Sequence, residues 1–291
     1  MIIIAIMSAV TFILFGVDKY RAIRRRWRIP EATLLLFTLL FGGIGGLLGI
    51  LVFRHKTRKR KFRILVPLFA LWQVLLAAFF IWTADYYHAD PAAVAAMEPD
   101  ARVEIRETKE GWLFDGPAED TAIIFYPGAK VEPVSYAPLL HKLAETGADV
   151  FLVKMPLNLA FLGTDRAGDI IGRTSYRRYY IGGHSLGGAM AANYASAHDV
   201  DGVILLAAYP VKELDTDVLL IYGTEDRIVN KARIKDAERL VKGEYTEFVI
   251  EEGNHARFGN YGKQAGDGQA LITAEEQQGE TVRQITDMLG I

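Results

Sequence analysis

The sequence contains no cysteine. Disulfide bonds, thiol nucleophiles and cysteine-based metal sites are therefore excluded, and no disulfide pattern can indicate the compartment in which the protein works. Histidine is scarce, with six residues in 291, so any imidazole chemistry must come from a short set of candidates. The formal net charge of −2 is close to balance, but this average combines a basic amino-terminal part with a more acidic remainder.

Three long apolar stretches have no charged residue in their interior: Met1–Val17, Ala32–Phe53 and Ile64–Thr83. Each is near the length that a helix needs to cross the hydrocarbon layer of a membrane. The first stretch is too long for a signal peptide and lacks both a basic leader and a small-residue cleavage site, so we interpret it as a retained anchor. The sequence therefore predicts an all-α transmembrane region of about three segments in residues 1–84, and a multi-pass protein of the cell membrane.

Two strongly basic connectors, Lys19–Arg28 and Arg54–Arg63, separate these stretches, whereas Asp85–Asp100 contains no lysine or arginine. Because basic connectors favour the cytoplasm, the third stretch is expected to run outward and the rest of the chain to be extracytoplasmic. The connectors are expected to contact anionic membrane lipids rather than nucleic acid, since they flank apolar spans and form no soluble basic face.

The middle stretch leaves two arrangements open. If both basic connectors lie in the cytoplasm, it must enter the membrane and return; if it crosses, one connector breaks the positive-inside preference. Its five glycines between Gly42 and Gly49 fit a re-entrant turn, but their small-xxx-small spacing also lets helices pack closely, and we prefer packing. A nucleotide-binding loop is not expected, because the pattern G-x-G-x-x-G is not met.

After a short linker at residues 85–101, residues 102–291 alternate strand-like and helix-like segments. Alternating apolar and polar residues at Val103–Phe114 predict a hairpin. Further strands are expected at Ala122–Tyr126, Asp149–Lys154, Tyr179–Gly183, Gly202–Ala208, Val218–Tyr222 and Thr246–Ile250. Helices are expected at Val134–Thr146, Leu186–Ala197, Asn230–Val241 and Thr273–Met288. This alternation predicts an α/β fold, with a mainly parallel sheet and helices on both faces.

The most informative motif is Gly183-His184-Ser185-Leu186-Gly187, between an apolar strand-like run and a helix of small residues. This is the context of a nucleophile elbow, a sharp strand-to-helix turn on which the serine hydroxyl stands clear. The flanking glycines let strand and helix pack closely. G-x-S-x-G alone occurs often by chance, so Ser185 becomes a candidate nucleophile only if an acid and a base follow it.

Both partners follow in the order that such hydrolases use. Asp226 and then His255 each come directly after a predicted strand, and His255 is the one histidine downstream of Asp226. Serine, acid and histidine in this order predict a catalytic triad. Glu225 and Glu213 are the alternative acids. The other interpretations are that Asp226 only caps a helix and that His255 is an ordinary loop residue.

Loops at the carboxyl ends of the strands supply the other candidates. An oxyanion hole needs a backbone amide after the first central strand and one after the nucleophile, so we assign it to Ala129 and Leu186. Lys130 is expected to bind an anionic substrate group or to be solvated. Met155 is expected to line an acyl pocket, touch lipid or pack in the core. Phe258 begins a glycine-rich stretch that is either shaped around the substrate or flexible.

From about Ala122 to its end, the chain resembles alpha/beta hydrolases of a bacterial dienelactone-hydrolase-like group. The matching segments are Phe125–Val131, Gly182–Gly188 and Gly253–Gly259. The resemblance implies a triad of Ser185, Asp226 and His255. It implies no settled substrate, and the chemistry of such a triad needs no metal or organic cofactor.

The amino-terminal part, to about Thr83, resembles a separate family of small bacterial membrane proteins of unknown function. The matching segments are Asp18–Ala22, Trp27–Glu31 and Arg54–Lys59. This resemblance implies a membrane location and adds no chemistry.

The sequence therefore predicts a membrane-anchored serine hydrolase that cleaves an ester or related acyl bond of a small molecule or lipid through an acyl-enzyme. The alternative is a membrane protein whose hydrolase-like domain binds a ligand or partner without turnover. The intact order of serine, acid and histidine favours the enzyme. Transport through the apolar spans is disfavoured, because they contain no interior charge. The oligomeric state is not predicted.

Overall fold

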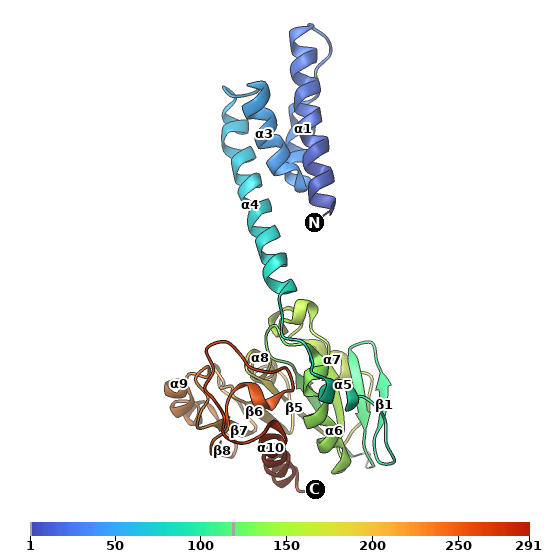
Figure 1. Cartoon of the computed structure of the whole chain (residues 1–291), viewed down its shortest axis with the longest axis vertical. Coiled ribbons are helices and arrows are strands. Elements are labelled where there is room, and N and C mark those ends of the chain that lie inside the picture. Colours follow the sequence, from blue (N-terminus) through green and yellow to red (C-terminus); the bar gives the residue numbers. More distant parts are fainter. Residues whose placement is uncertain (1, 118–119) are drawn as a thin grey trace. The chain divides into compact units, whose positions relative to one another are not determined.

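The computed structural model describes residues 2–117 and 120–291. The chain divides into two compact units, Met1–Ala84 and Asp85–Ile291 (Figure 1). After the expectations drawn from the sequence, we call them the membrane unit and the hydrolase unit, and we describe each by itself. The first residue of the first predicted apolar stretch, Met1, lies outside the described residues.

The membrane unit is entirely helical. It contains α1 (Ile2–Ile23), α2 (Glu31–Phe37), a π-helical turn η1 (Thr38–Gly42), α3 (Gly43–Phe53) and α4 (Arg60–Ala84). Ile2–Ile23, Glu31–Phe53 and Arg60–Ala84 are each long and apolar enough to cross a membrane. The predicted all-helical amino-terminal region with three apolar segments is thus confirmed.

The middle segment is broken between α2 and α3. Leu40 and Phe41 leave the helical conformation, with a φ of 64° at Phe41. Gln73 of α4 satisfies backbone groups at the break: its Nε2 donates to the Phe41 carbonyl at 2.6 Å, and its Oε1 accepts from the Ile44 amide at 2.9 Å. Buried backbone groups are costly when unpaired, so this buried glutamine explains how an irregular turn is tolerated between apolar helices.

The two ends of the middle segment meet. A straight helix of 23 residues would separate its ends by about 34 Å, yet Lys56 Nζ lies 3.0 Å from Glu31 Oε1. Beside them the fully buried Asp18 of α1 pairs with His55 Nε2 at 2.7 Å and accepts the Ile29 amide at 2.9 Å. The middle segment therefore folds back as a helical hairpin, and both basic connectors lie at the same end of the membrane unit.

Small residues bring the hairpin close to its neighbours. A Cβ atom added to Gly45 of α3 would lie 1.8 Å from the carbonyl oxygen of Ser8 in α1. The glycine-rich sequence thus serves close helix packing, as α3 lies against both α1 and α4 (Figure 1).

The hydrolase unit is built on one eight-stranded sheet with the order β1-β2-β4-β3-β5-β6-β7-β8. Its strands are β1 (Glu104–Glu107), β2 (Gly111–Asp115), β3 (Thr121–Tyr126), β4 (Asp149–Val153), β5 (Arg178–His184), β6 (Gly202–Leu206), β7 (Asp217–Gly223) and β8 (Tyr245–Ile250). The β1–β2 hairpin is antiparallel and joins β4 antiparallel, whereas β3 to β8 are parallel. The predicted mainly parallel sheet is confirmed.

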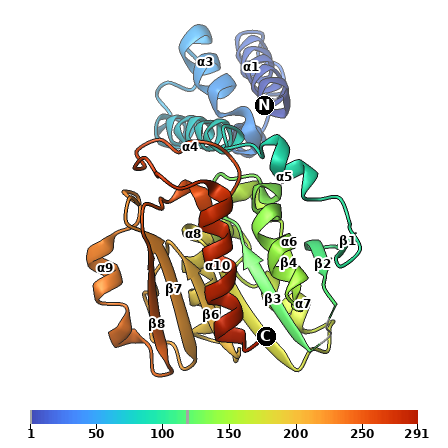
Figure 2. The same cartoon turned by 60° about the horizontal axis from the view of Figure 1, so that its bottom comes forward.

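Helices cover both faces of the sheet. On one face, α6 (Ala137–Glu145) and α10 (Ala274–Leu289) pack against one apolar core, and Figure 2 shows them in front of the strands. On the other face, α7 (Arg166–Ile171), α8 (Leu186–Ala195) and the short α9 (Lys231–Lys235) pack against a second core. The strands between these layers are buried on both sides, which explains their nearly continuous apolar sequences.

The helix predicted at Asn230–Val241 is shorter than expected. After α9 the chain forms only a 3₁₀ turn at Glu238–Leu240. Val241 then makes an isolated parallel bridge with Leu214, and the Lys242 amide donates to the Leu214 carbonyl at 2.9 Å. Pairing with this loop replaces the helical hydrogen bonds that the sequence pattern favoured.

Residues 85–101, which we expected to be a linker, contact the rest of the hydrolase unit. Tyr87 forms a bridge with Val131, its amide donates to the Lys130 carbonyl at 2.7 Å, and its ring lies 5.5 Å from that of Tyr261. A short helix α5 (Pro91–Ala95) follows. Tyr87 therefore packs against the core of the hydrolase unit.

Candidate active site

Ser185 occupies a strained turn between β5 and α8. Its φ of 53° and ψ of −122° lie in a region that residues with a Cβ rarely adopt. A Cβ atom at Gly187 would lie 2.0 Å from the Tyr126 carbonyl oxygen, and one at Gly183 would lie 2.4 Å from it. Both flanking glycines are therefore needed for β3 to pass this closely, as a nucleophile elbow requires.

His255 and Asp226 are paired and buried beside this turn. His255 Nδ1 lies 2.8 Å from Asp226 Oδ2, and both side chains are at most 1% exposed. Asp226 Oδ1 accepts the amides of Ile228 and Val229, each at 2.8 Å. The carboxylate therefore binds the imidazole with one oxygen and its own loop with the other. This favours the tautomer with the proton on Nδ1, which leaves His255 Nε2 as a base.

Two alternatives remain to be compared with this pair: that Asp226 only caps a helix, and that Glu213 is the acid. Asn230, and not Asp226, caps α9, because its side chain accepts the amides at the start of that helix. Glu213 lies in the exposed loop before β7 and pairs with Lys242 at 3.2 Å. Asp226 is the carboxylate that binds His255.

A cavity of about 300 Å³ is lined by Ser185, Leu186 and His255. Much of the remaining wall is apolar and comes from two loops, after β6 and after Asp226. It comprises Ala207, Ala208, Tyr209, Val211, Ile228 and Val229. Sequence reasoning missed this wall, although each loop follows the carboxyl end of a strand, where sites of such sheets form. No helix stands between β6 and β7 in the described part of the chain, and Val211 is 65% exposed.

The two proposed oxyanion donors lie on adjoining segments. Leu186 is the first residue of α8, so its amide has no acceptor within the helix. The amides on either side of Ala129 are engaged, Gly128 with the Tyr136 hydroxyl at 3.1 Å and Lys130 with the Asn158 carbonyl at 2.8 Å. Across residues 2–117 and 120–291, no acceptor is found for the Ala129 amide itself.

The three predicted substrate contacts do not line this cavity. Lys130 forms an ion pair with Asp85 at 3.7 Å. Met155 and Phe258 are buried in opposite cores of the sheet, with exposures of 3% and 0%. Phe258 lies 5.6 Å from the ring of His184. The structure thus brings together Ser185, Leu186 and His255 at the cavity and leaves these three side chains outside its wall.

A buried polar network that no sequence pattern predicted adjoins His255. The Gly128 amide donates to the Tyr136 hydroxyl, which lies 2.8 Å from His184 Nδ1. With that amide as donor, the hydroxyl proton goes to His184 Nδ1. The His184 ring lies 4.5 Å from that of His255. Complete burial, and then the charge of His255, lower the pKa of His184 well below its usual value, so His184 stays neutral beside the proposed base.

This lowered pKa predicts a pH-dependent loss of stability. Below about pH 6.5 the unfolded chain protonates His184 while the folded protein does not, so the free energy of unfolding falls as the pH decreases. The slope from this residue is at most about 1.4 kcal/mol per pH unit. Denaturant unfolding of the full-length protein in detergent between pH 7.5 and 5 will measure it. The curve of His184→Gln should be flatter than that of wild type; parallel curves would contradict the assignment.

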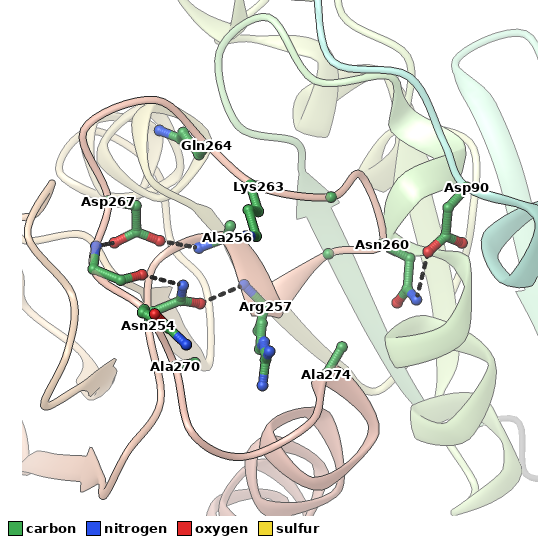
Figure 3. Close-up of a pocket in the computed structure, with 14 residues that line it drawn as sticks. Asp90, Asn254, Ala256, Arg257, Asn260, Lys263, Gln264, Asp267, Ala270 and Ala274 are labelled. Carbon is green, nitrogen blue, oxygen red and sulfur yellow. Dashed lines mark hydrogen bonds between the residues drawn. The ribbon is translucent and has the colours of Figure 1, made fainter.

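A second cavity, of about 430 Å³, lies beside the loop that follows His255 (Figure 3). Asp267 accepts the Ala256 amide at 2.9 Å, and Asn254 Nδ2 donates to the Gly268 carbonyl at 2.7 Å. These two bonds tie the end of the glycine-rich loop, at Asp267 and Gly268, to the segment Asn254–Ala256. Neither Ser185 nor His255 lines it.

One group of side chains has metal-ligating atoms close together. Donor atoms of Asp100, His141 and Glu145 lie within 4.8 Å of one another. The ring nitrogens of His141 already contact the Ala96 carbonyl at 2.9 Å and the Asp100 carboxylate at 3.2 Å. These contacts account for the positions of His141 and Asp100.

The chain belongs to the alpha/beta hydrolase family, whose model matches residues 122–279. A family of proteins of unknown function, DUF1294, matches residues 8–62. Consistent with the latter, the chain is 39% identical over 69 residues to the uncharacterized protein YsdA of Bacillus subtilis (strain 168), covering 24% of this chain and 78% of YsdA. Both resemblances seen in the sequence are confirmed.

Several solved structures are similar to this chain at low identity. TT1662 from Thermus thermophilus is 13% identical, with a TM-score of 0.50 over 65% of this chain and 99% of that chain. A predicted CIB-like hydrolase from Thermoplasma acidophilum is 17% identical, with a TM-score of 0.49 over 64% and 98%. Esterase 2 of Thermogutta terrifontis is 15% identical, with a TM-score of 0.47 over 66% and 97%.

Proposed function

We propose that the protein is a membrane-anchored serine hydrolase that cleaves an ester or related acyl bond. One observation carries this proposal: a serine on a strained turn and a histidine bound to a buried aspartate line the same cavity. Membership of the alpha/beta hydrolase family and three helices of membrane-crossing length support it.

In the proposed reaction, Ser185 Oγ attacks the carbonyl carbon of the substrate while His255 Nε2 takes the hydroxyl proton. Asp226 holds the imidazole in the required tautomer and stabilises the imidazolium that forms. The Leu186 and Ala129 amides stabilise the oxyanion. His255 then gives its proton to the leaving alcohol, and the acyl-enzyme remains on Ser185. Water, activated in turn by His255, releases the acid and restores the serine.

Turnover is a better account than ligand binding alone. Backbone strain at Ser185 is a cost that binding does not require. His255 Nε2 is buried and has no hydrogen-bond partner among residues 2–117 and 120–291, so a base faces the site without a structural role for that atom. These features favour the enzyme over the binding module.

The surroundings of the site favour substrates with an apolar acyl group, either small molecules or lipids. The cavity wall offers small and aliphatic side chains, and one side is open. We also propose that the basic connectors contact anionic lipids on the cytoplasmic side and that the hydrolase unit is extracytoplasmic. The shared end of both connectors supports this orientation, since every lysine and arginine of residues 1–84 then lies on a single side.

A fluorophosphonate probe, which reacts with activated serines, tests the function. The purified full-length protein in detergent should be labelled, and peptide mass spectrometry should place the probe on Ser185. Ser185→Ala and His255→Ala should remain unlabelled, whereas Ser196→Ala, at the end of α8, should be labelled like wild type. An unlabelled wild type of native thermal stability, or equal labelling of Ser185→Ala, would favour the binding module.

A further inference from the structure

The loop between β4 and α7 exposes several apolar side chains, and we call its residues Pro156–Leu162 the apolar tip. Leu157, Phe161 and Leu162 are 39%, 49% and 44% exposed. Leu159 and Ala160, between them in the chain, are buried. The loop is therefore anchored by some of its apolar residues while it presents the others outward, although burial would favour all of them.

The tip has a defined and strained conformation. Two 3₁₀ turns, Pro156–Asn158 and Ala160–Leu162, make up most of it. Leu157 and Asn158 have φ values of 53° and 54°, which side chains with a Cβ rarely adopt. The Asn158 carbonyl accepts the Lys130 amide at 2.8 Å. Strained backbone that holds apolar side chains exposed is typical of a site that binds another surface.

Few residues of the chain separate this tip's contacts from the end of a helix long enough to cross a membrane. Asp85 follows the last residue of α4, a helix of membrane-crossing length. Two residues later the Tyr87 amide donates to the carbonyl of Lys130, whose own amide binds Asn158 of the tip. Residues 85–87 span at most about 10 Å. In any orientation of the hydrolase unit, the tip is held within a short distance of the end of α4.

The tip lies on the same edge of the sheet as the active site. It follows the carboxyl end of β4, as Ser185 follows the carboxyl end of β5, and both strands run parallel to β3. The edge of the sheet that bears the cavity therefore faces any surface that the tip contacts.

We propose that Leu157, Phe161 and Leu162 insert into the surface of the bilayer that holds α4, and that this contact presents the active-site edge to esters carried in the membrane. The second part rests on the proposed hydrolase function, and the first part does not. The partner is thus a lipid surface, and the substrate class is an amphiphilic ester that partitions into it.

The absence of native cysteine allows a direct test of position. Phe161→Cys and Ile291→Cys, each labelled with the environment-sensitive fluorophore NBD, are reconstituted as full-length protein in vesicles of phosphatidylcholine and phosphatidylglycerol. Ile291 is a matched control because it is 44% exposed and lies beyond α10 at the opposite edge, where Arg178 at the start of β5 binds the Leu289 carbonyl.

At position 161 we expect a blue-shifted emission that lipids bearing a doxyl quencher diminish; at 291 we expect the emission of a water-exposed probe. Equal, unquenched emission at both positions overturns the docking proposal whatever the activity.

Activity then tests the substrate class. The double variant Phe161→Ser and Leu162→Ser should lose about tenfold in the hydrolysis of a vesicle-borne fluorogenic diacylglycerol ester, because less apolar area reaches the lipid. Its rate on water-soluble p-nitrophenyl acetate should stay within about twofold of wild type, and Ile291→Ser should change neither rate. An equal loss on both substrates, or none on the vesicle-borne ester, overturns lipid presentation. A wild type inactive on both substrates refutes the hydrolase proposal and leaves the fluorescence result to decide docking.

Discussion

Asp226→Asn is expected to lower kcat for ester hydrolysis about 10⁴-fold while the protein stays folded. The asparagine Oδ1 still accepts the Ile228 and Val229 amides, so the loop after β7 is retained. The amide nitrogen replaces the oxygen that lies 2.8 Å from His255 Nδ1. A donor there forces the imidazole proton to Nε2, and His255 can no longer accept the proton of Ser185.

The measurement is steady-state kinetics on a soluble ester, with thermal unfolding of each variant as the check on folding. Glu225→Gln and Glu213→Gln are the matched controls, because each removes a carboxylate that the sequence offered as an alternative acid. Both should stay within about twofold of wild type. If a control variant loses activity and Asp226→Asn does not, the acid has been assigned to the wrong residue.

The sequence predicted the elements of the candidate site because each has a local signal. The strand-to-helix turn at Ser185 is marked by its two glycines, and the central strands by apolar runs that are buried on both faces. The mainly parallel sheet followed from their alternation with helices. Such a sheet brings loops from its carboxyl ends to one edge, so Asp226 and His255 could be expected near each other.

Other features depend on contacts between distant residues that no local pattern encodes. Tyr136 and His184 are 48 positions apart and are joined by one buried hydrogen bond. Met155 and Phe258 follow strand ends, as substrate contacts would, but apolar side chains there are equally suited to the core, and the core takes them. The polarity of a side chain and its position in the chain do not show whether it lines a cavity or packs in the core behind it.

The membrane unit shows the same limit. Charge placement left two arrangements of the middle apolar stretch open, and the hairpin depends on a residue outside that stretch. Gln73 of α4 satisfies the Phe41 carbonyl and the Ile44 amide at the break. No pattern in the sequence links this glutamine to the residues that it binds. Its role is visible only when the helices are packed together.

Gly187→Ala is expected to lower kcat about 10²–10³-fold through the oxyanion hole, although the substitution touches no reacting atom. The added Cβ would lie 2.0 Å from the Tyr126 carbonyl and 2.4 Å from that of Pro127. Carbon and carbonyl oxygen normally approach to about 3.3 Å, so this loop must move by about 1 Å. Ala129 lies two residues beyond Pro127, and a displacement of about 1 Å at a catalytic donor costs on the order of 10²-fold.

Gly279→Ala separates this effect from the general response to replacing a helical glycine. Nothing lies within 4 Å of a Cβ at Gly279, in the interior of α10. That variant should keep wild-type kinetics and gain roughly 0.5–1 kcal/mol of stability, because alanine favours the helix. Kinetics and thermal unfolding are measured on both variants in detergent. If Gly187→Ala retains wild-type kcat, the Tyr126–Ala129 loop does not supply an oxyanion donor, and the proposed mechanism would have to rely on the Leu186 amide alone.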